Sequence, residues 1–319
     1  MSAFKLPPYK KILETAALLL FATGIIGMLI PHGIGDQELR SMRHLPITGH
    51  ILVFFLGAYL FYTFRPGLSA RPMHIQILRL LFATLLAGII LESFQAVIPG
   101  RTASARDLLA NITGAMIYLS VRNLKSFSMH LPFHVSVAVI TGLLLWPLLR
   151  SVIDERIAAN QFPLLAGFET PFEHTRFAGN HGRFSVSNEF GFYGDRSLKL
   201  SLGTETFSGL SLDYMPGDWQ GYSLLHLAVY NPQPTPVILT VRIHDAVHET
   251  DGMWQYTDRY NQRFSLSPEK WTTIQIPLED VKHAPETRKM NMDQIRNVGF
   301  FVTQAPNPLT LYLDDIRLK

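Results

Sequence analysis

Five long apolar segments in the first half of the chain constrain its fold more than any other feature. Each approaches the roughly 20 residues that an α-helix needs to cross the hydrocarbon core of a bilayer. The fourth is the shortest and contains Asn111, so it is the weakest of the five, and a re-entrant segment is the alternative to a span there. The sequence therefore predicts an α-helical transmembrane bundle of about five helices within residues 1–150. We place these helices near residues 12–30, 47–64, 75–98, 107–121 and 133–149.

The Lys and Arg residues of the short connections predict the orientation of this bundle. Positively charged loops favour the cytoplasmic side of a membrane. If every segment spans, one side holds the lysines before the first segment, Arg65 and Arg71 after the second, and Arg122 and Lys125 after the fourth. The other side holds Arg40, Arg43, Arg101 and Arg106, so the bias is a majority. We therefore expect the N-terminus inside, in a bacterial cytoplasmic membrane, and everything after about residue 150 outside the cytoplasm.

After residue 150 the apolar residues change from helical to alternating spacing. Alternation over short runs with Gly and Pro between them is typical of half-buried strands in a sandwich or jelly roll. We predict an all-β jelly-roll sandwich over residues 164–319, joined to the bundle by a tether at 151–163. The clearest alternating runs are residues 197–202, 237–244, 298–302 and 309–313.

Charge and cysteine content exclude several classes of function. Residues 1–150 contain 13 Lys and Arg against 5 Asp and Glu, and the remainder contains 15 against 20. The predicted soluble half is therefore mildly acidic, which argues against nucleic-acid binding. The chain has no Cys, which excludes disulfides, thiolate catalysis and thiolate metal sites.

Polar side chains gather around the third and fourth apolar segments. Glu92 and Gln95 are three residues apart and share a helix face, as Asp107 and Asn111 do at a spacing of four. In the predicted topology these groups converge near the outer leaflet, and ionisable groups in a membrane usually mark function. The alternative is hydrogen-bonding between helices as a structural role. The candidate site comprises His50, Glu92, Gln95, Arg101, Ser104, Asp107 and Asn111.

This polar pattern resembles the signature of the VanZ-like family of bacterial membrane proteins, over about residues 10–125. That family tends to carry a His in the preceding helix, which His50 matches, whereas Pro46 and Ile47 stand where its Asp and Lys would be. The resemblance implies an association with resistance to a glycopeptide antibiotic and assigns no biochemical activity. The matching residues are Glu92, Gln95, Pro99, Arg101, Ser104, Asp107, Asn111 and Gly114.

The second half resembles the jelly-roll carbohydrate-binding modules that have a galactose-binding-like fold. The matching pieces are residues 167–169, 194–198, 271–278 and 313–316. Such modules often carry a structural Ca²⁺, an ion that takes oxygen ligands. The resemblance implies that Glu169 and Asp314 would be its ligands here.

Sugar binding needs flat aromatic faces together with polar groups for the hydroxyls. The segment around Trp254 is too polar for a core strand, so at least one ring there is expected to be exposed. The alternative is that most of these aromatic residues belong to the core, as is usual. The candidates are Trp219, Tyr222, Trp254, Tyr256 and Tyr260, with Asp251, Arg259 and Gln262 nearby.

Together these features predict a bacterial envelope protein in contact with membrane lipid. The leading hypothesis is a non-catalytic protein whose sandwich binds an envelope polysaccharide. The rival is a membrane enzyme that acts on a lipid-linked glycan precursor, with Glu92, Asp107 and His50 as acid–base groups and Arg101 on the phosphate. Transport is a third reading, for which five helices without an internal repeat give thin support.

Overall fold

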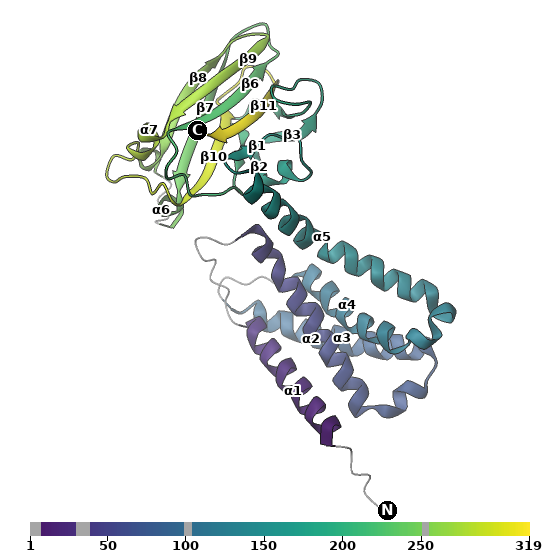
Figure 1. Ribbon diagram of the computed structural model, residues 1–319. Helices are drawn as coiled ribbons and strands as arrows, with labels where there is room; N and C mark the ends of the chain where they lie inside the picture. Colours follow the sequence, from purple (N-terminus) through teal and green to yellow (C-terminus); the bar gives the residue numbers. More distant parts are fainter. Residues whose placement is uncertain (1–7, 30–38, 99–103, 251–254) are drawn as a thin grey trace, which may run out of the picture. The chain divides into compact units, whose positions relative to one another are not determined.

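The computed structural model describes residues 8–29, 39–98, 104–250 and 255–319. The chain divides into two compact units, Met1–Ser151 and Val152–Lys319. The first unit is helical and the second is a β-sandwich (Figure 1). The predicted order of the two fold classes is therefore confirmed.

The described part of the helical unit consists of long helices and short 3₁₀ turns. Within the part of the chain that the structure describes, four helical stretches are long and apolar enough to cross a membrane, judged by length and composition: residues 11–29, 40–64, 73–95 and 124–161. The α-helices are α1 (Pro8–Leu29), α2 (Leu45–Phe64), α3 (Met73–Gln95), α4 (Ala105–Arg122) and α5 (Leu131–Gln161), with η1 (Arg40–His44), η2 (Pro66–Ala70) and η3 (Leu124–His130) between them.

Helix α4, expected as the fourth membrane span, is not among those four stretches. It packs against both α2 and α3, and Ala110 and Leu119 are fully buried there. A Cβ on Gly114 would lie 2.1 Å from the carbonyl oxygen of Ile51 in α2, so this close approach requires glycine. Because neighbouring helices cover α4, it keeps polar side chains that a lipid-facing helix of its length would not.

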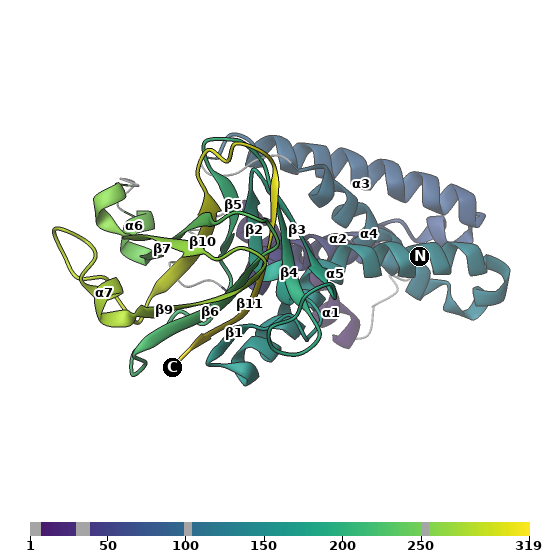
Figure 2. The same ribbon diagram turned by 90° about the horizontal axis from the view of Figure 1, so that it is seen from above.

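The β unit consists of two antiparallel sheets that face one another (Figure 2). The first sheet has the order β3-β4-β11-β6-β9, with β1 also paired to β11, and the second has the order β2-β5-β10-β7-β8. The strands are β1 (Leu164–Ala166), β2 (Phe177–Asn180), β3 (Gly182–Ser187), β4 (Ser197–Leu202), β5 (Ser208–Leu212), β6 (Leu224–Asn231), β7 (Val237–Asp245), β8 (Tyr260–Leu266), β9 (Lys270–Pro277), β10 (Ile295–Val302) and β11 (Leu309–Leu318). Short helical turns are η4 (Glu173–Arg176), α6 (Ala246–Thr250), η5 (Tyr256–Asp258) and α7 (Leu278–Lys282).

The core of the sandwich follows the alternation that the sequence shows. Val241 of β7 and Phe300 of β10 point inward and are almost completely buried. Arg242, between two core residues of β7, therefore lies on the outer face of the second sheet. This alternation confirms the predicted sandwich and places a charged residue on the outer face.

The predicted tether at residues 151–163 is largely helical. Helix α5 continues to Gln161, and its last turns belong to the β unit. Asp154 in these turns is buried. The segment is therefore a packed part of the second unit.

Candidate functional site

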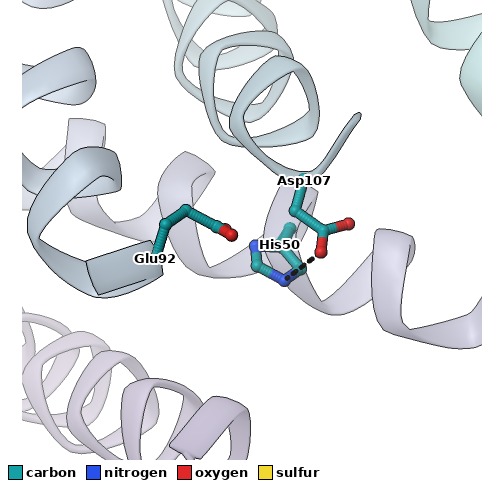
Figure 3. Close-up of side chains that lie close together, drawn as sticks. All are labelled: His50, Glu92 and Asp107. Atoms are coloured by element: carbon teal, nitrogen blue, oxygen red, sulfur yellow. Dashed lines mark ion pairs between the residues drawn. The ribbon is translucent and has the colours of Figure 1, made fainter. Parts of the chain in front are cut away.

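Three of the predicted polar residues form a compact group in the helical unit. His50 comes from α2, Glu92 from α3 and Asp107 from α4, and Figure 3 shows their side chains turned toward one another. One nitrogen or oxygen atom of each lies within 4.8 Å of those of the other two. The Nε2 atom of His50 is 3.8 Å from Oδ2 of Asp107. Three helices thus bring a histidine and two acids to one place.

Asn111 and Ser104 complete this group. The Nδ1 atom of His50 lies 2.8 Å from Oδ1 of Asn111, and both residues are buried. The backbone N–H of Ser104 donates to Oε2 of Glu92 at 2.9 Å. The Ser104 hydroxyl accepts from the backbone N–H of Arg106, which caps the start of α4. The start of α4 is therefore held directly against Glu92.

One other predicted member, Gln95, makes its contact outside this group. Gln95 is buried, and its amide nitrogen donates to the carbonyl oxygen of Met28 at 2.9 Å. Gln95 therefore ties α3 to α1. Arg101 lies outside the described residues, so the structure brings together five of the seven candidates.

The predicted sugar-binding aromatics are dispersed. Trp219 and Tyr260 are 1% and 5% exposed and belong to the core, so neither can present a ring face to a ligand. Tyr222 packs edge-on against Phe162 and, with Trp219, borders a cavity of about 620 Å³. Tyr256 is 67% exposed. Trp254 lies outside the described residues.

Both burials depend on tertiary packing, which the local sequence does not show. Trp219 lies in the connection between β5 and β6. The indole of Trp219 is fixed by a hydrogen bond to the carbonyl oxygen of Pro216. Tyr260 begins β8 on the inward face of its sheet. Tyr256 is the most exposed of the described candidates, and the guanidinium of Arg259 lies over its ring, 5.8 Å from the centroid.

The two predicted calcium ligands brace one loop between β3 and β4. Glu169 accepts hydrogen bonds from the backbone N–H groups of Asp195 and Arg196 at 2.8 and 2.7 Å. Asp314 accepts from Phe192 and Tyr193, and also from the N–H of its own neighbour in β11. Its carboxylate is thereby satisfied without an ion. Calcium binding at these two residues stays a prediction.

A cleft on the outer face of the second sheet contains two arginines. Arg242 of β7 and Arg259, which precedes β8, both line a cavity of about 170 Å³. At about 30 Å³ per water, this is room for roughly five or six waters. The remaining lining residues are Asn180, Phe207, Gly209, Leu210, Ser211 and Phe301.

The guanidinium groups in this cleft are incompletely paired. Arg242 donates to Oγ of Ser211 at 3.3 Å and to Oδ1 of Asn297 at 3.1 Å. The Nε atoms of Arg242 and Arg259 are buried and have no hydrogen-bond partner among the residues that the structure describes. Burial, followed by the nearby charge of Arg259, lowers the pKa of Arg242 below its ordinary value. An anion in the cleft would relieve both effects.

The sequence indicated two of the residues that line this cleft. Arg259 stood among the polar neighbours of the predicted aromatics, and the alternation of β7 put Arg242 on the polar face. Ser211, Phe207 and Phe301 were missed, because their proximity depends on the pairing of β10 with both β5 and β7. No local signal reveals that pairing.

Comparison with protein families corrects the first resemblance. Residues 168–313 match the model of the family described as Complex I intermediate-associated protein 30 (CIA30). No match to the VanZ-like family was found, so that expectation for residues 10–125 is wrong. A few polar residues at helical spacing indicate only that they share a helix face. Such faces also occur in unrelated membrane proteins. A search of curated proteins gave no match.

Several solved structures are similar to the β half at low identity. An exo-beta-agarase is 16% identical over 49% of this chain and 24% of its own, with a TM-score of 0.39. The family 11 carbohydrate-binding module of a cellulosomal cellulase of Clostridium thermocellum is 14% identical over 49% of this chain and 92% of its own, with a TM-score of 0.35. A xylan-binding domain from Paenibacillus barcinonensis has the same values. The chain thus spans about a quarter of the agarase and nearly all of each module.

Proposed function

We propose that this protein is a membrane-anchored binding protein whose β unit takes a carboxylate-bearing ligand in the cleft between Arg242 and Arg259. The observation that carries this proposal is the pair of buried Nε atoms without a hydrogen-bond partner among the described residues. Buried polar atoms in native proteins are normally satisfied. Two such atoms in one cavity favour a ligand that accepts hydrogen bonds there.

A carboxylate is the anion that fits this arrangement best. Guanidinium groups present N–H donors in a planar fork that matches the two oxygens of a carboxylate. Among the described residues, no salt bridge joins an acidic side chain to Arg242 or Arg259, and the nearby charges of Asp213 and Glu249 only partly offset the lowering of the Arg242 pKa. The cavity is also too small for a large polyanion to enter whole, so one acidic group of a larger ligand would occupy it.

An acidic glycan and an acidic segment of a partner protein share this chemistry. Exposed rings support the glycan, because Phe207 lines the cleft and is 52% exposed, and Tyr256, beside the guanidinium of Arg259, is 67% exposed. The partner protein is supported by the family match, whose description names association with an intermediate of complex I. Every cleft residue lies within the matched range.

Anchoring by the helical unit is part of the same proposal. Its four long apolar helices support insertion into a membrane. Arg122 at the end of α4 donates to Ser69 of η2 and lies over the ring of Tyr62, so the basic ends of α2 and α4 share one side of the unit. By the positive-inside bias this side would be cytoplasmic, which would put the β unit outside the cytoplasm.

The experiment compares retention of the full-length protein, in detergent, on immobilised polygalacturonate and on neutral xylan. We expect retention on polygalacturonate, and we expect Arg242→Gln and Arg259→Gln each to weaken it by about tenfold or more. Arg263→Gln is the matched control, because Arg263 is exposed on β8 and does not line the cleft. Equal retention of all three variants and the wild type would contradict the proposal.

A protein partner would give a different pattern. In that case polygalacturonate would not retain the wild type, whereas cross-linking in cells would capture a membrane partner that Arg242→Gln loses and Arg263→Gln keeps. The cleft would be overturned as the binding site if polygalacturonate does not retain the wild type and if Arg242→Gln captures the same membrane partner as the wild type.

A further inference from the structure

We infer that His50, Glu92 and Asp107 form a binding site for a divalent transition-metal ion in the helical unit. The inference does not depend on the cleft of the β unit, since all three residues belong to the first unit. Among the described residues this is the one group of three or more His, Asp and Glu with ligand atoms so close together. Figure 3 shows that the three side chains approach a common point from α2, α3 and α4.

The hydrogen bond between His50 and Asn111 leaves one imidazole nitrogen of His50 with a lone pair that can bind a metal ion. The amide oxygen of Asn111 accepts a hydrogen bond and cannot donate one, so it holds the proton on Nδ1 of His50 at 2.8 Å. The lone pair is then on Nε2, the atom that faces Asp107. Metal-ligating histidines are usually oriented in this way by a hydrogen bond at the other ring nitrogen.

Glu92 supplies the second, independent observation. The residue is 8% exposed, and its Oε2 accepts from the backbone N–H of Ser104. Its Oε1 is buried and has no partner within the described part of the chain. A buried carboxylate oxygen without a donor is costly, and in a bilayer it would be more so. A cation between Glu92, His50 and Asp107 would satisfy it.

The spacing of the ligand atoms fits one ion. The 3.8 Å between Nε2 of His50 and Oδ2 of Asp107 is too long for a hydrogen bond. Metal–ligand bonds of about 2.0–2.2 Å hold ligand atoms roughly 3–4 Å apart. The observed separations, all within 4.8 Å, would close onto an ion by small side-chain movements.

The donor set indicates the class of metal. One imidazole nitrogen favours zinc and its first-row neighbours over Mg²⁺ and Ca²⁺, which take oxygen ligands. Three protein ligands leave a coordination position open for water or substrate, as in sites where zinc performs chemistry. Asp107 is 24% exposed at its side chain, so this position has access from outside the helical unit.

The test is metal binding by the full-length protein in detergent after treatment with a chelator. Added Zn²⁺ should bind and raise the melting temperature, and Co²⁺ should give a visible absorption band from a nitrogen and oxygen site. Glu92→Gln and Asp107→Asn should each weaken Zn²⁺ binding by at least about tenfold, and Asn111→Ala by about 10- to 100-fold. Glu14→Gln in α1 and His74→Asn in α3 are matched controls outside the group and should bind as the wild type does.

Comparison between variants separates this site from histidines elsewhere in the chain. If Glu92→Gln fails to fold, Asn111→Ala and the Co²⁺ spectrum still decide, because Asn111 touches no metal in this arrangement. The inference is overturned if the stripped wild type binds no more Zn²⁺ than a variant lacking all three ligands. It is also overturned if the Co²⁺ spectrum survives replacement of His50 by Ala.

Discussion

Arg176 and Asp154 form a fully buried ion pair in the β unit, 22 residues apart in sequence. The guanidinium donates to the carboxylate at 2.9–3.1 Å, and the two side chains are 0% and 3% exposed. A third donor of Arg176 bonds the carbonyl oxygen of Leu165 in β1 at 2.7 Å. This pair fastens the last turns of α5 to the first strand of the sandwich.

Removal of one partner of this pair should destabilise the β unit. Asp154→Asn leaves the Arg176 charge buried and unbalanced, and we expect a loss of about 3–5 kcal/mol in the free energy of unfolding. Urea unfolding followed by tryptophan fluorescence measures it. Glu279→Gln, which breaks an exposed pair with Lys282, is the control and should have little effect. Equal small losses for both variants would contradict the structural role of the buried pair.

Asp314 should make the stability of the β unit depend on pH. Burial, opposed by three backbone N–H donors, raises the pKa of Asp314 to about 6 from its ordinary value of 3.8. The folded state therefore holds an extra proton between about pH 4 and 6, and this contribution to the free energy of unfolding falls as pH rises through that window. Asp314→Asn should remove this part of the dependence.

The same titration tests the predicted calcium site. A bound Ca²⁺ would favour the ionised carboxylate and shift the transition of Asp314 to lower pH. A pH titration of stability with and without Ca²⁺ measures that shift. An unchanged transition would show that Glu169 and Asp314 brace the loop without an ion.

Replacement of Gly114 by a larger residue should destabilise the helical unit. Gly114→Ala places a methyl group against the backbone carbonyl of Ile51, and overpacking of this kind costs about 1–3 kcal/mol. Gly142→Ala in α5 is the matched control, because nothing lies within 4 Å of a Cβ there. We expect the melting temperature in detergent to fall for Gly114→Ala and not for Gly142→Ala. The reverse order would contradict the packing of α4 on α2.

The absence of Cys makes the orientation of the chain directly measurable. Lys125→Cys lies in η3, on the side predicted to be cytoplasmic, and Ser185→Cys lies on β3 in the β unit; both positions are exposed. A membrane-impermeant maleimide added to intact cells should label Ser185→Cys and leave Lys125→Cys unlabelled until lysis. If intact cells label only Lys125→Cys, η3 lies outside the cytoplasm and the proposed topology is contradicted.

The sequence predicted the two fold classes because each rests on a local period. Alternation in residues 237–244 gave a strand with Arg242 on its polar face, and long apolar runs gave the helices. The extension of α5 to Gln161 was missed because its support is tertiary, namely the buried pair of Asp154 with Arg176. The compact group of His50, Glu92 and Asp107 followed from convergence of helix ends, whereas its contacts with Asn111 and Ser104 depend on side-chain geometry that spacing does not show.

Retention of the full-length protein on polygalacturonate, before and after Arg242→Gln, tests the central claim most directly. The cleft predicts that the wild type and Arg263→Gln are retained to the same extent and that Arg242→Gln elutes at least about tenfold more readily. Retention of the wild type that Arg242→Gln leaves unchanged would contradict the assignment of this cleft as the carboxylate-binding site.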